Sequence, residues 1–473
     1  MNYERITNES LEASWAEDKK LRGEPEVLTK LFHQAVPVLQ YLDWKVIDIE
    51  RGFTETVLPL NVTSTNQHIT HQAAVILIAA DYTGGIALST LFPYVPLVGI
   101  HPQKTDYAAY LWGATADIKW IKPSCDNLVC IARIPKERHA VLANRFFKGK
   151  RVLETVKIDM YNGDNIVAEA NIKYWVQDTY ALRKNAFDEN RINILYKHRQ
   201  STSAKLIAGL RFLEQEKLPN ERLFEDKFAE LLAENHGRIL AQRFCLIAPQ
   251  LQPMVASRTK NLDDAINDFH KNKPIQIVNI GVGLDTRILR LNLPSDSIVF
   301  ELDLPVMLRR RNELFEKLQS NSSIKRISIP LDLHEHEPAV LVIQHEEFNK
   351  ELPTFVIWEG GSMYFNSEDT SRILSSISDL LIHNDSLCWI DYVYQSVIDR
   401  TTGITVVDAF MDAMSCLGEP FIQGFSNIEQ QLNSCNLTIE KDVASSHYLT
   451  DTTDPVFELY RFCLIKRLGE INE

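Results

Sequence analysis

The chain has 473 residues, of which 45% are hydrophobic and 24% are charged, and its formal net charge at pH 7 is −13. This length predicts two or three domains, because a single hydrophobic core stops growing at about 250–300 residues. The acidic balance argues against a nucleic-acid partner, since proteins that bind nucleic acids carry a basic face. The most basic stretch, RRRNELFEK (309–317), is interpreted as a solvated helix face.

The N-terminal residues, MNYERITNESLEASWAEDKK, are polar and acidic, so no secretory signal is expected. The longest apolar run, AAVILIAA (73–80), is far shorter than the roughly 20 residues of a membrane span, so no membrane partner is expected. The seven cysteines are scattered without a CxxC pair. This usage is typical of reduced thiols, so we expect a cytoplasmic protein with neither disulfides nor a metal site.

Residues 1–178 are predicted to form one α+β domain. Helical spacing over 26–39 is followed by a strand over 55–62, and the segment 71–92 is apolar on nearly every face, which predicts a helix buried all round. Four strand-like runs follow, at 116–122, 127–134, 151–161 and 165–177. The last two are joined by Asn162-Gly163-Asp164, which is a hairpin signal. Because helices do not alternate with these strands, the pattern is that of an antiparallel sheet and not of a βαβ fold.

Residues 179–200 are charged and poor in apolar side chains, and they are predicted to be a linker. From 201 to 473 short apolar runs alternate with helical or loop stretches, which predicts a doubly wound, mostly parallel sheet with helices on both faces. The strands of this α/β domain are expected at 275–283, 297–303, 325–333, 354–361 and 386–393, with a helix and two further strands near the end of the chain.

The stretch VNIGVGLDTRILRL (278–291) resembles the start of a nucleotide-binding site. Gly281 and Gly283 supply a tight turn that lets the backbone approach a ligand closely. The dinucleotide fingerprint fails because Thr286 replaces its third glycine, and no Lys-Ser/Thr pair follows at the spacing of a phosphate-binding loop. Asp285 would repel a pyrophosphate and suits a cationic ligand. The alternative is that the two glycines only form a turn and that Asp285 caps the next helix.

The next strand ends in Glu301-Leu302-Asp303, 18 to 20 residues beyond Gly283. A doubly wound fold places there the acid that binds ribose hydroxyls. A ribose-binding acid, carboxylates nearby and no phosphate cradle together indicate S-adenosyl-L-methionine, which carries a positive sulfonium and no phosphate.

Six blocks occur in order in this half of the chain: LFEDKFA, SRTKNLDDAI, NIGVGLDTR, FELDLP, PLDL and WEGGSMYF. They resemble the leucine carboxyl methyltransferase family of class I S-adenosyl-L-methionine-dependent O-methyltransferases, over about 200–470. The resemblance implies that Gly281 lies under the cofactor and that Asp303 binds its ribose. It implies that Asp332 and Leu333 contact the adenine of the cofactor and that Glu359 lies near the methionine moiety. It further implies that Arg258 and Lys205 are basic residues for the carboxylate of the cofactor.

The sequence departs from the family pattern at two places. Asp226-Lys227 replaces the usual Asp-Pro of the first block, and Gly361 stands where a bulkier residue is common. We expect Gly361 to leave extra room for a substrate.

Methyl transfer from a sulfonium is a direct displacement, to which the protein contributes mainly alignment and a desolvated site. A hydroxyl acceptor would need a general base, whereas a carboxylate is already ionised near pH 7. No histidine base stands out, which favours a carboxylate. Tyr364 and Tyr392 follow strands at the expected rim of the site, and either is a candidate contact of the acceptor, Tyr364 first.

The segment TNQHITHQAAVILIAADYTGG (65–85) resembles the N…HGG…D block of hot-dog acyl thioesterases and acyl-binding proteins, over about 30–178. Carried over, the matching catalytic positions are Asn66, His71 and Asp81. Both glycines of HGG are replaced here, so two interpretations stay open: an active thioesterase, or a domain that binds an acyl group or only dimerises. The resemblance implies a homodimer formed through this domain.

These observations predict a hot-dog domain followed by a Rossmann-like class I methyltransferase domain. The expected function is O-methylation of a carboxylate or hydroxyl on a small acyl or polyketide-type natural product. Acyl thioesters and an acyl carrier protein are candidate partners of the first domain. The alternative is a protein C-terminal carboxyl methyltransferase whose hot-dog domain is non-catalytic.

Overall fold

The computed structural model of the chain describes residues 6–101, 107–179, 181, 202–318, 324–417, 419–449 and 453–469. The chain divides into two compact units, an N-terminal unit up to residue 196 and a C-terminal unit from residue 197, with residues 415–418 grouped with the first. Of the predicted linker, 179–200, only Thr179 and Ala181 are among the described residues.

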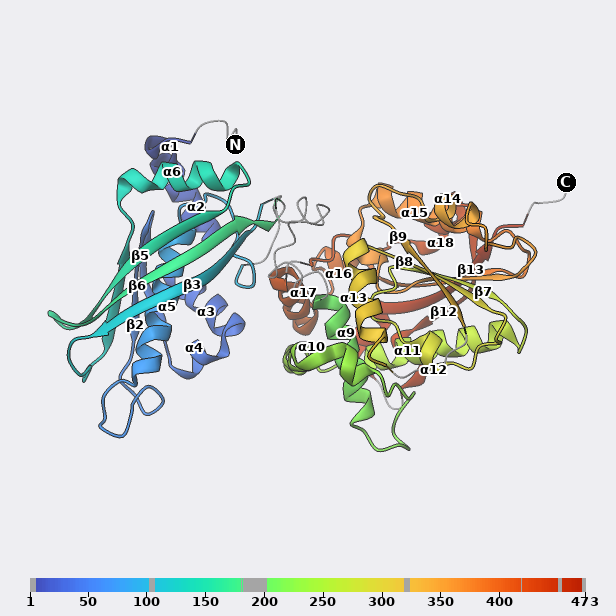
Figure 1. Ribbon diagram of the computed structural model, residues 1–473, viewed down its shortest axis with the longest axis horizontal. Helices are drawn as coiled ribbons and strands as arrows, with labels where there is room; N and C mark the ends of the chain where they lie inside the picture. Colours follow the sequence, from blue (N-terminus) through green and yellow to red (C-terminus); the bar gives the residue numbers. More distant parts are fainter. Residues whose placement is uncertain are drawn as a thin grey trace. The chain divides into compact units, whose positions relative to one another are not determined.

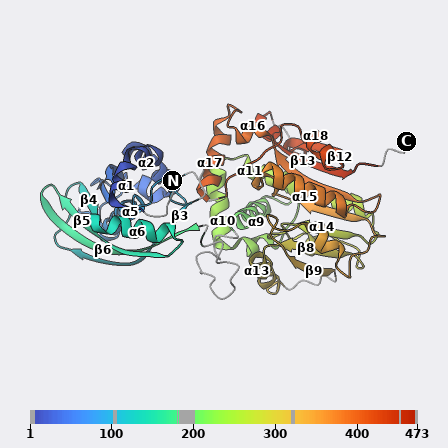
Figure 2. The ribbon, with the colours of Figure 1, turned by 90° about the horizontal axis from the view of Figure 1, so that it is seen from above.

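The N-terminal unit is an antiparallel sheet curved around one long helix, α5 (Ala73–Ser89) (Figures 1 and 2). Most of α5 is buried, as its apolar sequence predicts. Gly163, between the last two strands in sequence, has a positive φ of 54°, which the hairpin turn requires. The strands, in sheet order, are β1 (Lys45–Glu50), β2 (Phe53–Leu58), β4 (Leu128–Arg133), β5 (Val152–Asn162), β6 (Asn165–Asp178) and β3 (Ala109–Trp120). The predicted α+β hot-dog fold is confirmed.

Prolines correct two boundaries in this unit. The helix expected over 26–39 is two helices, α3 (Pro25–Ala35) and α4 (Pro37–Tyr41), because Pro37 cannot continue a helix and keeps Val36 extended. The strand expected over 55–62 ends at Leu58, before Pro59. The sequence analysis missed β1 and three helices, α1 (Asn8–Ala13), α2 (Trp15–Arg22) and α6 (Lys136–Phe147).

The C-terminal unit contains a seven-stranded, mostly parallel sheet (Figure 1). Its strand order is the doubly wound one, with the first strand of the unit, β7, inside the sheet between β10 and β8, and only β13 runs in the opposite direction to the other six strands. In sheet order the strands are β12 (Leu437–Ala444), β13 (Tyr460–Arg467), β11 (Leu387–Val393), β10 (Thr354–Trp358), β7 (Gln276–Ile280), β8 (Ile298–Asp303) and β9 (Lys325–Pro330). The predicted α/β fold is confirmed.

Helices cover both faces of this sheet, because its central strands are apolar on both faces. Val278 and Phe300 pack on one face and their neighbours Ile277 and Val299 on the other. The first face is covered by α14 (Pro338–Ile343), α15 (Ser367–Leu380) and α18 (Ile428–Ser434). The second is covered by α9 (Thr202–Gln215), α10 (Ala229–Ile247), α11 (Leu251–His270), α12 (Arg287–Arg290) and α13 (Pro305–Phe315). Between β11 and β12 the chain inserts α16 (Gln395–Ile398) and α17 (Thr405–Leu417).

The interpretation of RRRNELFEK as a solvated face is wrong for one residue of α13. Arg309 is exposed, but Arg311 is fully buried, with an ion pair of 2.7 Å from its Nη2 to Glu301.

Six cysteines of the described part of the chain carry free thiols. Within that part, no helix combines the length and the apolar character that crossing a membrane requires.

Candidate functional site

A cavity of about 330 Å³ lies in the C-terminal unit, where β7, β8 and β10 end. Small-molecule sites of open α/β sheets occupy this position, outside the carboxyl ends of the parallel strands, and they have volumes of roughly 300–1,000 Å³. Three residues that directly follow or end these strands line it: Gly281, Asp303 and Glu359.

The glycine turn after β7 forms one wall of the cavity. Gly281 has φ 71° and Gly283 has φ 48°, values that side chains disfavour, so the turn requires glycine at both positions. Asp303, at the end of β8, binds this turn: its Oδ2 accepts the Gly283 amide at 2.8 Å and its Oδ1 accepts the Leu304 amide at 2.7 Å. Burial nevertheless raises the pKa of Asp303 to about 6.

Asp285 lines the cavity, but protein groups compensate its charge. Its Oδ2 lies 3.1 Å from Nη1 of Arg287 and accepts a hydrogen bond of 2.8 Å from the side chain of Asn279. Burial alone would raise the pKa of Asp285, but the charges of Arg287 and Arg311 outweigh burial and lower it. Much of the attraction that Asp285 was expected to offer a cationic ligand is therefore directed at Arg287.

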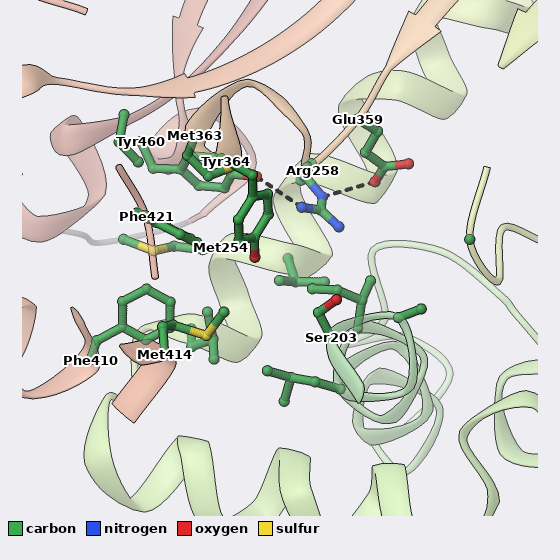
Figure 3. A pocket seen from close by; sticks show the side chains of 18 of the residues that line it. Ser203, Met254, Arg258, Glu359, Met363, Tyr364, Phe410, Met414, Phe421 and Tyr460 are labelled. Atoms are coloured by element: carbon green, nitrogen blue, oxygen red, sulfur yellow. Dashed lines mark hydrogen bonds and ion pairs between the residues drawn. The ribbon is translucent and has the colours of Figure 1, made fainter. Parts of the chain in front are cut away.

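Glu359, directly after β10, is held by two arginines. Nε of Arg258 lies 2.8 Å from its Oε1, and Nη1 of Arg287 lies 2.6 Å from its Oε2. Burial opposes ionisation, but the two guanidinium groups lower the pKa of Glu359, so it is ionised at neutral pH. Figure 3 shows Arg258 at the cavity wall between Glu359 and Tyr460.

A buried acid behind this wall, Asp391 of β11, connects Arg258 to the turn after β10. Its Oδ1 accepts the Gly360 amide at 2.6 Å. Its Oδ2 accepts a hydrogen bond from the Tyr460 hydroxyl and lies 3.4 Å from Nη1 of Arg258. Nη1 of Arg258 also donates to the Tyr460 hydroxyl at 3.0 Å. Asp391 therefore fixes both the turn and the arginine.

Two predicted cofactor residues are engaged elsewhere and do not line the cavity. Nζ of Lys205 lies 2.7 Å from Glu234. Glu301 is fully buried, with its carboxylate 2.7 Å from Arg311 and 2.5 Å from Arg326. Glu301 therefore neutralises two arginines of the neighbouring elements, while Asp303, two residues later, reaches the cavity.

The predicted adenine contacts, Asp332 and Leu333, lie after β9 and are not part of the cavity wall either. Oδ1 of Asp332 accepts the His334 amide at 2.9 Å, and the carbonyl of Leu333 accepts Nη2 of Arg372 at 2.5 Å. Both residues order the turn between β9 and α14.

The part of the cavity that faces away from Glu359 is apolar. Tyr364 lies beside it, with its hydroxyl pointing into the cavity (Figure 3). Tyr392 does not line the cavity, because it is buried and donates to Asp442 at 3.0 Å. The apolar lining residues are Met254, Met363, Val393, Val397, Val406, Val407, Phe410, Met414, Phe421, Val456 and Leu459.

The two departures from the family pattern both have structural reasons. Gly361 does not leave room for a substrate, as was expected: a Cβ there would lie 2.3 Å from Nε1 of Trp358, so the space belongs to that indole. In the Asp226-Lys227 loop, buried Asp226 lies 3.0 Å from Nε of Arg211 and accepts the Thr286 hydroxyl at 2.7 Å. Arg211 itself lines the cavity.

In the N-terminal unit, the predicted residues before α5 bind neighbouring loop residues. Nδ1 of buried His71 lies 2.8 Å from Oγ of Ser124, and its Nε2 lies 3.2 Å from the carbonyl of Pro59. Oδ1 of Asn66 accepts the His68 amide at 2.8 Å, and its Nδ2 donates to Thr70 at 2.9 Å. Burial lowers the pKa of His71, so it is neutral at pH 7.

Asp81 lies apart from His71. It is the ninth residue of α5, which begins at Ala73, and eight residues of helix rise by about 12 Å. Burial raises the pKa of Asp81. The Tyr174 hydroxyl donates to the Asp81 carbonyl at 2.6 Å. Within one copy of this unit, His71 and Asp81 therefore do not converge on one atom.

Sequence reasoning missed Arg211, Asp391 and Tyr460. A signal existed for Asp391, since it is the only charged residue of the apolar strand LCWIDYV (387–393). Arg211 and Tyr460 carried no comparable signal, because their importance depends on partners distant in sequence, Asp226 and Arg258.

Two curated relatives, one from Mycobacteroides abscessus and one from Mycobacterium ulcerans, are provisionally named S-adenosyl-L-methionine-dependent methyltransferases. The first is 30% identical over 173 residues, 33% of this chain and 54% of the relative. The second is 31% identical over 172 residues, 33% of this chain and 56% of the relative. The chain spans about half the length of the curated relatives it matches.

Solved structures match each unit at low identity. A provisionally named methyltransferase from Thermobifida fusca has a TM-score of 0.41 and 16% identity, covering 57% of this chain and 96% of that one. A provisionally named thioesterase from Shewanella oneidensis has a TM-score of 0.27 and 17% identity, covering 32% of this chain and 98% of that one. Residues 204–378 match the sequence model of the leucine carboxyl methyltransferase family.

Proposed function

We propose that the C-terminal unit is an S-adenosyl-L-methionine-dependent O-methyltransferase whose acceptor is the carboxylate of a small apolar acid, such as an acyl or polyketide-type natural product. The observation that carries the proposal is the cavity at the ends of β7, β8 and β10, where the Gly281–Gly283 turn meets Asp303. The names of the curated relatives support the choice of cofactor.

The lining residues fit this cofactor. The turn offers backbone close to a ligand without a phosphate-binding lysine, and Asp303 offers a carboxylate for ribose hydroxyls. Arg258 and Arg211 are cations for the carboxylate of the methionine moiety, and Glu359 is an anion for its ammonium. When bound, S-adenosyl-L-methionine supplies a methyl group on a positive sulfur, so that a C–O bond forms as the C–S bond breaks.

The acceptor must arrive already ionised. The acids of the cavity wall are either paired with arginines or bound to backbone amides, and none of the described residues that line it is a histidine. Burial raises the pKa values of Tyr364 and Tyr460 well above their ordinary range, so both stay protonated and each hydroxyl is a hydrogen-bond donor. Without a base to deprotonate an alcohol, a carboxylate is the acceptor that this lining can use. The Tyr364 hydroxyl, which points into the cavity, is the donor that would orient it.

Radiolabelled methyl transfer tests this function. The acceptors are a set of apolar carboxylic acids, the primary alcohols of the same length and a peptide that ends in leucine. We expect label in the acids and none in the alcohols. Equal transfer to the alcohols would contradict the carboxylate proposal, and transfer to the peptide alone would establish the protein carboxyl methyltransferase alternative.

We further propose that the N-terminal unit is a dimerising, acyl-binding domain without thioesterase activity. The side chain of Asn66 is used within its own loop, and both ring nitrogens of His71 are used by Ser124 and Pro59, which supports a structural role for both residues. The edge strand β3 is 12 residues long, and among the described strands its one neighbour is β6; apart from a bridge at Ala109 to Leu97, its other edge supports pairing with a second copy. An acyl carrier protein is a candidate donor of the acyl group.

A further inference from the structure

The cavity of the C-terminal unit has two chemically different halves. The half at the ends of β7 and β8 carries charged side chains, among them Arg258, Asp303 and Glu359. The other half is lined by methionine, valine, leucine and phenylalanine, and none of the described residues that line it is charged. These apolar residues form a hydrophobic cluster separate from the two that cover the sheet. Transfer from water into this half lowers the free energy of an apolar group but raises that of a polar group that finds no hydrogen-bond partner there.

One face of α17 forms the end of the apolar half. Val406, Val407, Phe410 and Met414 line the cavity, and their spacing along the sequence places them on one side of the helix. Figure 3 shows Phe410 and Met414 across the cavity from Arg258 and Glu359. An elongated acceptor molecule whose reacting end lies near Arg258 and Tyr364 therefore points its other end towards α17.

Salt bridges hold this helix in place. Arg400, which precedes α17, lies 3.6 Å from Asp408 and 2.9 Å from Asp412. It also donates to the carbonyl of Asp408 at 2.7 Å. The position of the cavity end is thus fixed by contacts on a part of α17 that does not face the cavity.

Phe410 separates the cavity from another aromatic residue. The ring centroids of Phe410 and Phe244 lie 6.1 Å apart, and Phe244 of α10 does not line the cavity. Phe421 packs against Phe410 on one side and Tyr364 on the other, at 5.7 Å and 5.2 Å. Removing the Phe410 ring would thus extend the apolar half towards Phe244, whereas a larger side chain at Met414 would shorten it.

We propose that the apolar half is the binding site for the hydrocarbon tail of an unbranched alkanoic acid, and that Phe410 and Met414 set the greatest tail length that the enzyme accepts. This rests on the proposed methyltransferase function. The carboxylate lies beside Tyr364 and the tail ends against α17. Methionine side chains are flexible, so Met414 can follow the end of a shorter tail.

The test measures kcat/KM for alkanoic acids of four to sixteen carbons with radiolabelled S-adenosyl-L-methionine. We expect wild type to lose activity sharply beyond one chain length, since one methylene too many costs about tenfold or more in a closed apolar pocket. Phe410→Ala moves this limit to longer acids. Met414→Trp moves it to shorter acids. Phe410→Leu, a milder truncation, gives a smaller shift in the same direction as Phe410→Ala and replaces it if that variant does not fold.

Ala409→Ser is the matched control, because Ala409 is an exposed residue of the same helix that does not line the cavity. We expect its chain-length limit to equal that of wild type. An unchanged limit in both Phe410→Leu and Met414→Trp, with cofactor affinity retained by calorimetry, would overturn the proposal. A wild-type protein that binds the cofactor but methylates no acid of any length would instead refute the carboxylate function on which the proposal rests.

Discussion

Asp303 keeps a raised pKa of about 6 although two backbone amides donate to it, because burial costs its charged form more than these bonds return. Ribose hydroxyls donate to the ionised form. Cofactor binding therefore favours ionised Asp303, and we expect the affinity for S-adenosyl-L-methionine to rise between pH 5 and pH 7, with a midpoint near 6. Calorimetry across this range measures it.

Asp303→Asn is the control for this titration. It keeps the size of the side chain but cannot ionise, so we expect about tenfold weaker binding at pH 7.5 and no midpoint near 6. The raised pKa also affects the stability of the ligand-free protein. Because the folded state favours protonated Asp303, the free energy of unfolding falls as the pH rises through 6. A wild-type affinity that does not change with pH would contradict the ribose assignment.

Gly361 provides a second prediction at this scale, on stability. A Cβ at this position would lie 2.3 Å from Nε1 of buried Trp358, so Gly361→Ala forces the indole to move. Overpacking of this kind costs about 1–3 kcal/mol of the free energy of unfolding, which urea denaturation would measure. Gly469→Ala is the control, since nothing lies within 4 Å of its added Cβ. Equal stability of the two variants would show that the indole moves freely.

Among the elements, those with a clear periodic pattern were predicted and those with mixed polarity were not. Strand β7 alternates between two apolar faces, and α5 is apolar all round, so both follow from sequence alone. Strand β1, KVIDIE, and helix α6, KERHAVLANRFF, interrupt their apolar residues with charges, and their burial depends on tertiary partners. The break at Pro37 was readable but was overlooked.

The candidate site shows the same division. The glycine turn and Asp303 were predicted because both follow from strand ends. Glu301 could not be told apart from Asp303, since only the folded protein brings Arg326, 25 residues away in sequence, to its carboxylate. The roles of Asp391 and Lys205 likewise depend on contacts across the fold.

The edge strand β3 carries the prediction of a dimer. Trp112 and Trp120 are 51% and 50% exposed on it, which is unusual for large aromatic side chains at the edge of a sheet. We expect light scattering to give twice the mass of one chain for wild type and the mass of one chain for the double variant Trp112→Lys, Trp120→Lys. Leu246→Lys, at a residue that is 85% exposed in the C-terminal unit, should leave the dimer intact. A monomeric wild type would rule out the proposed pairing.

At the scale of the whole molecule, the two units raise the question of whether one chain both releases and methylates an acid. Hydrolysis of an acyl thioester would create the carboxylate that the C-terminal unit is proposed to methylate. Among the described residues of one copy, the groups for this step do not come together, since His71 is bonded to Ser124 and Pro59, and Asp81 lies about 12 Å along α5 from the start of the helix.

We therefore expect the protein to form methyl ester from a free acid but not from its acyl thioester, with the same result for Asp81→Ala. Radiolabelled S-adenosyl-L-methionine with either acceptor measures both reactions in one assay, and the free acid controls for the methyl transfer step. Ester formed from the thioester by wild type and lost in Asp81→Ala, while transfer to the free acid persists, would show that Asp81 acts in hydrolysis. In that case the site would have to be completed by a second copy, because the contacts within one copy commit both ring nitrogens of His71 to Ser124 and Pro59.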